Sequence, residues 1–213
     1  MEKQGHFIVF EGIDGSGKST QVRLLGERLR FLDIRFHSTV EPTRNPIGKL
    51  IRDTYLSGLI KADERVLRCL FAVDRLDHIT SEEHGLYTKI RNGINIIQDR
   101  GCMSNIAYRG PDMEIQDVLE IHKGVFGDLI PLKPTVTIFL DVDPKISMER
   151  VNMERSKKEI YETIDRQVAI RAEYFKAMEI LKAEGETFEI IDGSLYSQDV
   201  AKLIWDRISC LFE

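Results

Sequence analysis

The sequence predicts an α/β fold in three layers, with a five-stranded parallel sheet between two layers of helices. Short apolar runs alternate with longer segments of helical periodicity along the whole chain. Within the short runs, apolar residues occupy successive positions, which is typical of strands buried on both faces of a parallel sheet. The crossovers between such strands are expected to be right-handed.

Five segments have the length and composition of buried strands. Each is four to six residues long and mostly apolar. They are residues 6–10, 34–39, 94–98, 136–140 and 188–191. Ligands of such folds bind beyond the carboxyl ends of the strands, so the residues that follow these segments are the first candidates for a site.

Six other segments have the spacing of amphipathic helices. In residues 18–32, Val22, Leu25 and Leu29 follow one another at intervals of three and four, which places them on one side of a helix. The other expected helices are 62–79, 112–126, 144–153, 159–183 and 197–212.

Composition and charge exclude several classes of protein. The 35 acidic and 30 basic residues give a formal net charge of −5, which disfavours a broad nucleic-acid surface or a polybasic membrane anchor. No apolar run approaches the length of about 18 residues that a membrane span requires, and no signal peptide is recognisable. The three cysteines lack zinc-site spacing and fit a reducing compartment. We therefore expect a single cytoplasmic domain over residues 1–213 that binds neither nucleic acid nor membrane.

The first predicted strand runs directly into a phosphate-binding motif, G-x-x-x-x-G-K-[ST]. The motif comprises Gly12, Ile13, Asp14, Gly15, Ser16, Gly17, Lys18 and Ser19, followed by Thr20. Its glycines let backbone N–H groups surround a phosphate at the N-terminus of the next helix, where the helix dipole favours negative charge. We expect Lys18 to reach the β- and γ-phosphates and the Ser19 hydroxyl to ligate Mg²⁺. The sequence thus predicts a fold of the P-loop NTPase type with a nucleoside triphosphate–Mg²⁺ site.

The P-loop alone does not separate GTPases, ATP-driven motors and small-molecule kinases. The guanine-reading motif N-K-x-D is absent, and no apolar run ends in the Asp-Glu pair with which a motor activates water. A small-molecule kinase needs a second phosphate-binding set, because its acceptor must lie in line with the γ-phosphate.

Residues after the third predicted strand provide such a set. Asp99 and Arg100 stand at its carboxyl end, and Ser104, Asn105 and Tyr108 follow shortly afterwards. In a parallel sheet this end lies beside the P-loop. An acid there can hold Mg²⁺ through water, and a guanidinium can bind the acceptor phosphate with two hydrogen bonds.

Two more segments contribute candidates at the same rim. Phe71 and Arg75 share one face of the predicted helix 62–79, where the ring could stack on a base and the guanidinium could bond its edge or the phosphate. Periodicity alone favours a core position for Phe71. Glu41 and Arg44 follow the second predicted strand, and Arg44 is a candidate phosphate ligand.

A cationic stretch over about residues 150–158 is a candidate helical lid. It contains Arg150, Arg155, Lys157 and Lys158. Positive charges that close over a triphosphate can exclude water and neutralise charge in the transition state. A solvated helix face is the alternative interpretation of the two lysines.

Taken in order, these motifs resemble the thymidylate kinase family of nucleoside monophosphate kinases. The resemblance runs from Phe10-Glu11 and the P-loop through Glu41-Pro42, Asp74-Arg75 and Asp99-Arg100 to the cationic stretch. It implies transfer of the γ-phosphoryl group of ATP to dTMP, with Mg²⁺ as cofactor. It also implies a homodimer built from packed helices beside the site.

The resemblance assigns roles to individual residues. Phe71 would stack on thymine, Arg75 and Asn105 would bond its edge, and Tyr108 would crowd the 2′ position of the sugar. Asp14 would contact the 3′-hydroxyl or the Mg²⁺ waters, and Arg100 would bridge donor and acceptor phosphates. The P-loop has no Arg between its glycines, so the lid would supply the catalytic arginine. The catalytic candidates are Lys18, Asp14, Arg100, Arg150 and Arg155; the substrate-binding candidates are Glu41, Arg44, Phe71, Arg75, Arg100, Ser104, Asn105 and Tyr108; the metal-binding candidates are Ser19 and Asp99.

Two positions depart from the family pattern. Gly101 stands where an aromatic residue or His usually follows Asp-Arg, and Val40 stands where Arg commonly precedes Glu-Pro. Both positions bear on how strictly the acceptor is chosen, so a related kinase for dUMP or other nucleoside monophosphates stays open as an alternative. An ATP-binding switch without phosphoryl transfer is a second alternative.

Overall fold

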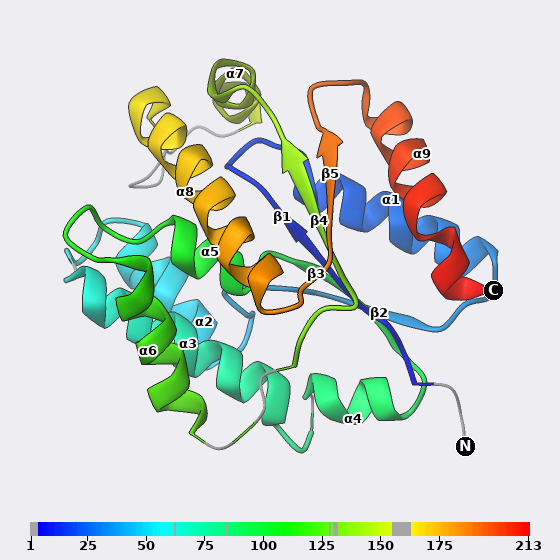
Figure 1. Cartoon of the computed structure of the whole chain (residues 1–213), viewed down its shortest axis with the longest axis horizontal. Coiled ribbons are helices and arrows are strands. Elements are labelled where there is room, and N and C mark those ends of the chain that lie inside the picture. Colours follow the sequence, from blue (N-terminus) through cyan, green and yellow to red (C-terminus); the bar gives the residue numbers. More distant parts are fainter. Residues whose placement is uncertain (1–3, 62, 84, 128, 130–131, 155–162) are drawn as a thin grey trace.

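The predicted α/β sandwich is confirmed by the computed structural model, which describes residues 4–61, 63–83, 85–127, 129, 132–154 and 163–213 (Figure 1). Five strands form one all-parallel sheet in the order β2-β3-β1-β4-β5. The strands are β1 (Phe7–Glu11), β2 (Phe36–Val40), β3 (Asn95–Asp99), β4 (Val136–Asp141) and β5 (Phe188–Asp192).

Burial differs between the interior and the edge of the sheet. Every residue of β1 and β3 is buried, as the runs of successive apolar residues predicted. The edge strands β2 and β5 are largely half-buried or exposed. The prediction of burial on both faces is therefore wrong for these two strands, which the helical layers cover only in part.

Six helices correspond to the predicted ones. They are α1 (Lys18–Phe31), α3 (Glu64–Thr80), α6 (Ile115–Phe126), α7 (Pro144–Glu154), α8 (Ile164–Ala183) and α9 (Ser197–Ile208), the last continuing as a 3₁₀ turn (Ser209–Phe212). The residues before α8 that were expected to extend it, 159–162, lie outside the described residues.

Three further helical segments were not predicted. They are α2 (Pro46–Leu50) with its π-helical continuation (Ile51–Leu56), α4 (Leu86–Arg91) and α5 (Cys102–Ala107). Each named segment has only five or six residues, which is too short for an apolar stripe to repeat. In the part of the chain that the structure describes, no helix is long and apolar enough to cross a membrane.

The two faces of the sheet carry separate layers. Helices α1 and α9 cover one face, and α3, α4, α5, α6 and α8 lie on the other (Figure 1). Successive residues of β1 alternate between them: Ile8 and Phe10 pack toward α1 and α9, and Phe7 and Val9 pack toward α3 and α4. This alternation follows from the period of two along a strand.

The register of the sheet brings the chemistry-bearing segments together. Phe10 of β1 pairs with Asp99 of β3, which in turn pairs with Val40 of β2. The three strands therefore end at one level, and the residues that follow each of them emerge at the same edge.

The unequal burial of the strands has a measurable consequence. We expect Ile97→Ala in β3, where the side chain is 0% exposed, to lower the free energy of unfolding by about 2–5 kcal/mol. The same substitution at Ile190 in the edge strand β5, which is 46% exposed, should cost about 1 kcal/mol or less. Urea unfolding of the two variants measures the difference, and equal losses would contradict this account of the sheet.

Candidate functional site

The P-loop joins β1 to α1 in a conformation that only glycine adopts easily. Gly15 and Gly17 have φ angles of 73° and 96°, in the left-handed region that other residues avoid. A Cβ atom on Gly15 would also lie 2.2 Å from the carbonyl oxygen of Ser147. A cavity of about 600 Å³ borders the loop, with a volume within the usual range of small-ligand sites.

Lys18 lies buried inside this loop. Its ammonium group donates to the carbonyl oxygens of Gly12 at 2.9 Å and Ile13 at 2.7 Å. Burial, and next the charge of Arg100, lower the pKa of Lys18 to about 8. An additional anion at the loop would stabilise the charged form.

Ser19 and Asp99 form an oxygen pair at the start of α1. The Ser19 hydroxyl donates to Asp99 Oδ2 at 2.5 Å. The other carboxylate oxygen, Oδ1, is buried and has no hydrogen-bond partner among the described residues. Hydroxyl and carboxylate oxygens suit Mg²⁺. Within the described ranges no group of three or more His, Cys, Asp and Glu could hold a metal, so phosphate oxygens and water would complete the coordination.

Arg100 and Asp14 connect the P-loop to the end of β3. The Arg100 guanidinium pairs with Asp14 Oδ1 and donates to Ser104 Oγ at 3.3 Å. Burial opposes ionisation of Asp14, but Arg100 and next Lys18 lower its pKa. Arg100 has a φ of 67°, an uncommon conformation for a residue other than glycine and one that clusters at functional sites.

A narrow slot of about 60 Å³ opens beside this pair. Its lining includes Asp14, Glu41, Phe71, Arg75, Arg100, Ser104, Asn105 and Tyr108. The structure thus brings together all expected substrate-binding residues except Arg44. The slot shares Asp14, Glu41 and Arg100 with the cavity at the P-loop, so the two spaces adjoin.

Phe71 lies both at the slot and against the core, the two positions that its sequence context suggested. It lines the slot and also packs, partly buried, against the apolar core. The Arg68 guanidinium lies 5.0 Å from the centre of its ring. A flat ligand would meet the remaining ring surface.

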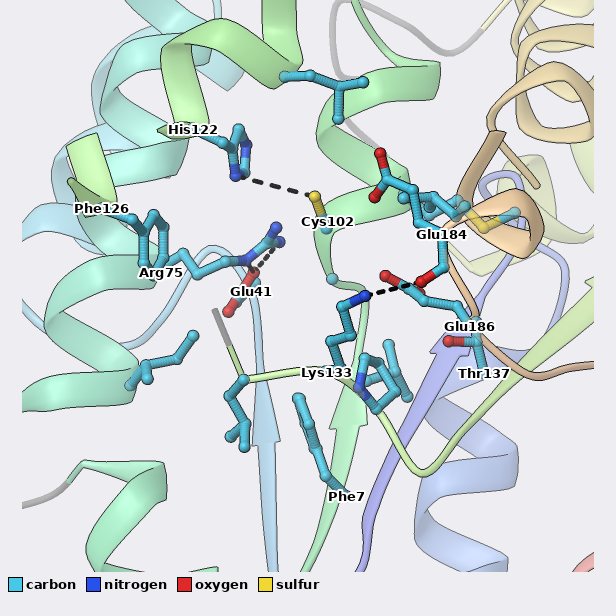
Figure 2. A pocket seen from close by; sticks show the side chains of 18 of the residues that line it. Phe7, Glu41, Arg75, Cys102, His122, Phe126, Lys133, Thr137, Glu184 and Glu186 are labelled. Atoms are coloured by element: carbon cyan, nitrogen blue, oxygen red, sulfur yellow. Dashed lines mark hydrogen bonds and ion pairs between the residues drawn. The ribbon is translucent and has the colours of Figure 1, made fainter. Parts of the chain in front are cut away.

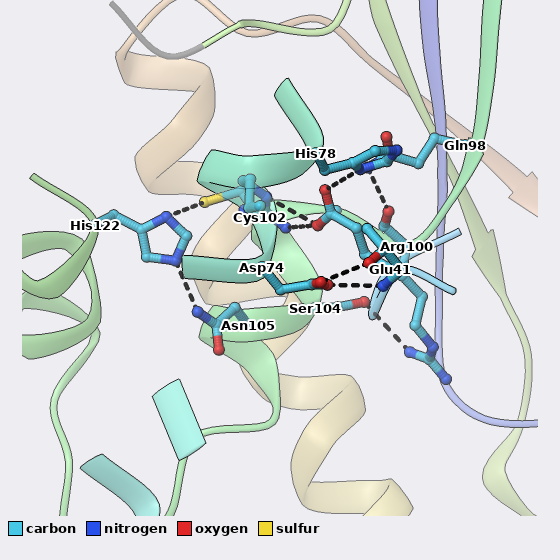
Figure 3. Close-up of polar contacts among 12 residues, drawn as sticks. Glu41, Asp74, His78, Gln98, Arg100, Cys102, Ser104, Asn105 and His122 are labelled. Carbon is cyan, nitrogen blue, oxygen red and sulfur yellow. Dashed lines mark hydrogen bonds and ion pairs between the residues drawn. The ribbon is translucent and has the colours of Figure 1, made fainter. Parts of the chain in front are cut away.

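Glu41 holds Arg75 in place at the other end of the slot. Arg75 Nε donates to Glu41 Oε2 at 2.9 Å (Figure 2). His78 Nδ1 lies 3.1 Å from Glu41 Oε1 (Figure 3). Burial alone would raise the pKa of Glu41, but Arg75 and His78 lower it to about 2. Arg75 Nη1 is buried without a hydrogen-bond partner in the described part of the chain.

Glu11, to which the sequence assigned no role, connects β1 to the segment after β3. Its Oε1 accepts from the backbone N–H groups of Gly101 at 2.7 Å and Ser104 at 3.0 Å, and its Oε2 accepts from the Tyr174 hydroxyl at 3.1 Å. Burial raises the pKa of Glu11. The sequence signal that could have indicated Glu11 is a carboxylate at the end of a buried apolar strand.

Helix α8 supplies two residues that local sequence patterns could not indicate. Gln167 Nε2 donates to Asp14 Oδ2 at 2.9 Å, and Gln167 Oε1 accepts from the Asp14 backbone at 3.1 Å. The hydroxyl oxygen of Tyr174 lies 2.7 Å from Ser104 Oγ. Both residues approach the site from more than 60 positions away in the sequence.

The expected lid is only partly described. Arg150, on α7, lines the P-loop cavity and donates to the carbonyl oxygens of Gly193 at 2.8 Å and Ser194 at 3.0 Å. Arg155, Lys157 and Lys158 lie outside the described residues.

Arg44 is exposed and lines a hollow separate from the slot. Arg52 is the arginine of this region that lines the P-loop cavity. Its guanidinium donates to the carbonyl oxygens of Pro42 and Thr43. Arg52 was missed because the π-helical turn that carries it has no distinctive sequence pattern.

Behind the slot lies a cavity of about 370 Å³, shown in Figure 2. Glu41, Arg75 and Gly101 line both spaces. Gly101 has no side chain that could separate the two spaces. A Cβ atom at Gly101 would lie 3.0 Å from Val9 Cγ1.

Comparison with known proteins identifies the family. The model of the thymidylate kinase family matches residues 10–204. The chain is 35% identical to a probable thymidylate kinase of Pyrobaculum aerophilum over 195 residues, which cover 92% of each protein. It is 35% identical to a probable thymidylate kinase of Methanococcus maripaludis over 93% of this chain and 88% of that protein. It is 30% identical to a thymidylate kinase of Bradyrhizobium over 96% and 90%. The family model and these relatives show that the chain, whose P-loop is joined to the slot by Arg100 and Asp14, belongs to the thymidylate kinase family.

Proposed function

We propose that this protein transfers the γ-phosphoryl group of ATP to dTMP, yielding dTDP and ADP. The observation that carries the proposal is the position of Arg100, which lines both the P-loop cavity and the slot. A guanidinium there can contact donor and acceptor phosphates together. The family match and the names of the relatives support the same reaction.

The geometry favours catalysis by positioning. Backbone N–H groups of the P-loop and the Lys18 ammonium would bind the β- and γ-phosphates, and Arg100 would hold the dTMP phosphate in line. The attacking phosphate oxygen is already anionic at neutral pH, so the reaction needs no strong general base. Neutralising the charge between two anionic reactants supplies most of the rate.

Ser19 and Asp99 are the residues that would hold Mg²⁺. The buried, unsatisfied Oδ1 of Asp99 supports this assignment. When bound, the ion would neutralise phosphate charge. Asp14, oriented by Arg100 and Gln167, would contact the 3′-hydroxyl or the waters of the ion.

The nucleoside would occupy the slot, which would have to widen from its volume of about 60 Å³ to admit it. Phe71 would stack on thymine, Arg75 and Asn105 would bond its edge, and Tyr108 would stand at the 2′ position of the sugar. All four residues line the slot. Glu41 would act through Arg75, and Ser104 would act through Arg100.

The lid, over about residues 150–158, would complete the site when ATP binds. Arg150 already lines the P-loop cavity, held by two backbone carbonyl oxygens. Its guanidinium would exchange these neutral acceptors for phosphate oxygens, and Arg155 is the second arginine proposed for this role.

We also propose that residues 1–213 form one domain, and that the protein works as a cytoplasmic homodimer. A single sheet with one helical layer on each face supports the first statement. Helix α3 displays exposed apolar side chains at Val66 and Val73, which supports a helical dimer surface beside the site.

ATP consumption across a panel of acceptors tests the function. With Mg²⁺ present, turnover should be high with dTMP and low with dCMP, dAMP, dGMP and no acceptor. Comparable turnover on dUMP and several others would assign Gly101 and Val40 to a relaxed acceptor site. ATP binding without acceptor-dependent turnover would instead indicate a nucleotide-dependent switch.

Loss of the P-loop ammonium should abolish most activity. We expect Lys18→Ala to lower kcat with dTMP by at least about 100-fold, because it removes charge aimed at the transferred group. Lys202→Ala, which removes an exposed lysine on α9, serves as the matched control and should leave kcat unchanged. Near-normal turnover by a folded Lys18→Ala protein would contradict the site assignment.

The sugar gate can be tested through the ring of Tyr108. Tyr108 is buried, with the Arg100 guanidinium 4.9 Å from its ring centre. Tyr108→Ala should raise kcat/KM for UMP relative to dUMP by about tenfold, because space opens at the 2′ position. Tyr108→Phe keeps the ring and should keep the ratio. If the alanine variant also keeps it, Tyr108 is not the gate.

A further inference from the structure

Asn105 lines the slot, and one atom of its side chain has no hydrogen-bond partner among the described residues. Its Nδ2 donates to His122 Nε2 at 2.7 Å and to the carbonyl oxygen of Arg68 at 3.4 Å. Its Oδ1 is buried and has no hydrogen-bond partner among the residues that the structure describes. Asn105 is 3% exposed and lines the slot. The unsatisfied atom of this amide is therefore a hydrogen-bond acceptor.

The neighbours of this amide determine its orientation. A backbone carbonyl can only accept a hydrogen bond, so the atom that faces the oxygen of Arg68 must be the amide nitrogen. The same nitrogen faces His122 Nε2, which must then be an acceptor as well. In a neutral imidazole the proton consequently resides on Nδ1, which faces Cys102 Sγ at 3.8 Å (Figure 3).

His122 is fixed and uncharged in this position. It extends from α6 with its ring stacked on that of Phe126, at 6.2 Å between centres and 5° between planes. Burial lowers the pKa of His122 to about 3, and the positive charges of Arg75 and Arg68 contribute to this decrease. The Nε2 lone pair is therefore available at neutral pH.

We propose that His122 is a positioning residue that determines base specificity, because it holds the Asn105 amide with Oδ1 toward the slot. This inference rests on the proposed function. Arg75 supplies the complementary group, since its Nη1 is a buried donor without a partner in the described part of the chain. Two side chains that line the slot thus have one unsatisfied acceptor and one unsatisfied donor.

This pattern matches the edge of thymine or uracil and opposes that of cytosine. A thymine or uracil ring has an N–H donor at position 3 and a carbonyl acceptor at position 4. Cytosine has an acceptor at position 3 and an amino donor at position 4. With cytosine, two acceptors would meet at Asn105 and two donors at Arg75, and both mismatches are unfavourable in a buried site. The pair does not separate thymine from uracil.

Without His122 the amide loses its stronger restraint. Only the 3.4 Å contact to the Arg68 carbonyl would remain. The amide could then rotate and present Nδ2 to N3 of cytosine. Arg75 would still oppose the amino group, so part of the preference should persist.

The experiment compares kcat/KM for dTMP and dCMP in two variants. His122→Phe keeps an aromatic ring beside Phe126 but removes the acceptor, and the dTMP/dCMP ratio should fall by at least about tenfold, or about 1.4 kcal/mol. His122→Gln retains an acceptor, its side-chain carbonyl oxygen, and should keep most of the preference. An unchanged ratio in the phenylalanine variant, or equal losses on both acceptors, would overturn the proposal.

A measurement on the unmodified protein covers the case in which His122→Phe fails to fold. Nitrogen-15 NMR of histidine-labelled protein should show His122 neutral at pH 7, with the proton on Nδ1. A proton on Nε2 would overturn the proposal. The binding ratio of dTMP to dCMP, measured by calorimetry, replaces the kinetic ratio if neither acceptor is turned over. The absence of turnover on both acceptors would reject the proposed function, and the binding ratio would still test the role of His122 in base specificity.

Discussion

The parallel pairing of β1 with β3 is the constraint on which the site depends. With Phe10 opposite Asp99, the P-loop and the segment after β3 leave the sheet at one level. A shift of one residue would turn the side chains of β3 to the opposite face and separate Ser19 from Asp99. Arg100 could then no longer line both the P-loop cavity and the slot.

Three carboxylates at this edge of the sheet are each held by several partners. Glu41 and Asp14 are each matched by an arginine from another segment, and Glu11 is matched mainly by backbone and hydroxyl donors. Removing one partner of such a pair costs more than the pair contributes to stability. These contacts therefore serve to fix the directions of guanidinium and carboxylate groups before a substrate arrives, so that little reorganisation remains for the reaction.

The sequence predicted the features that local patterns encode. The five strands and the P-loop combine short-range hydrophobic runs with a contiguous motif, and the slot residues follow strand ends or share a helix face. Gln167, Tyr174 and His122 escaped prediction because their roles depend on how α8 and α6 pack against the sheet. Arg44 and Arg52 show the same limit: both are arginines after β2, and only the π-helical turn over Ile51–Leu56 determines that Arg52 lines the P-loop cavity.

The proposed recognition of the base depends on polar contacts, because a cavity lies behind the slot. Arg75 and His122 both border this space of about 370 Å³, so they lack the close packing on that side that fixes side chains in a filled core. Arg75 is held by Glu41, and the Asn105 amide is held by His122. Because Gly101 has no side chain between the slot and the cavity, hydrogen bonds between side chains, rather than packing against a larger residue at this position, hold Arg75 and Asn105 in place. Under the proposal made above, the direction of the His122 Nε2 lone pair then determines which base edge the slot accepts.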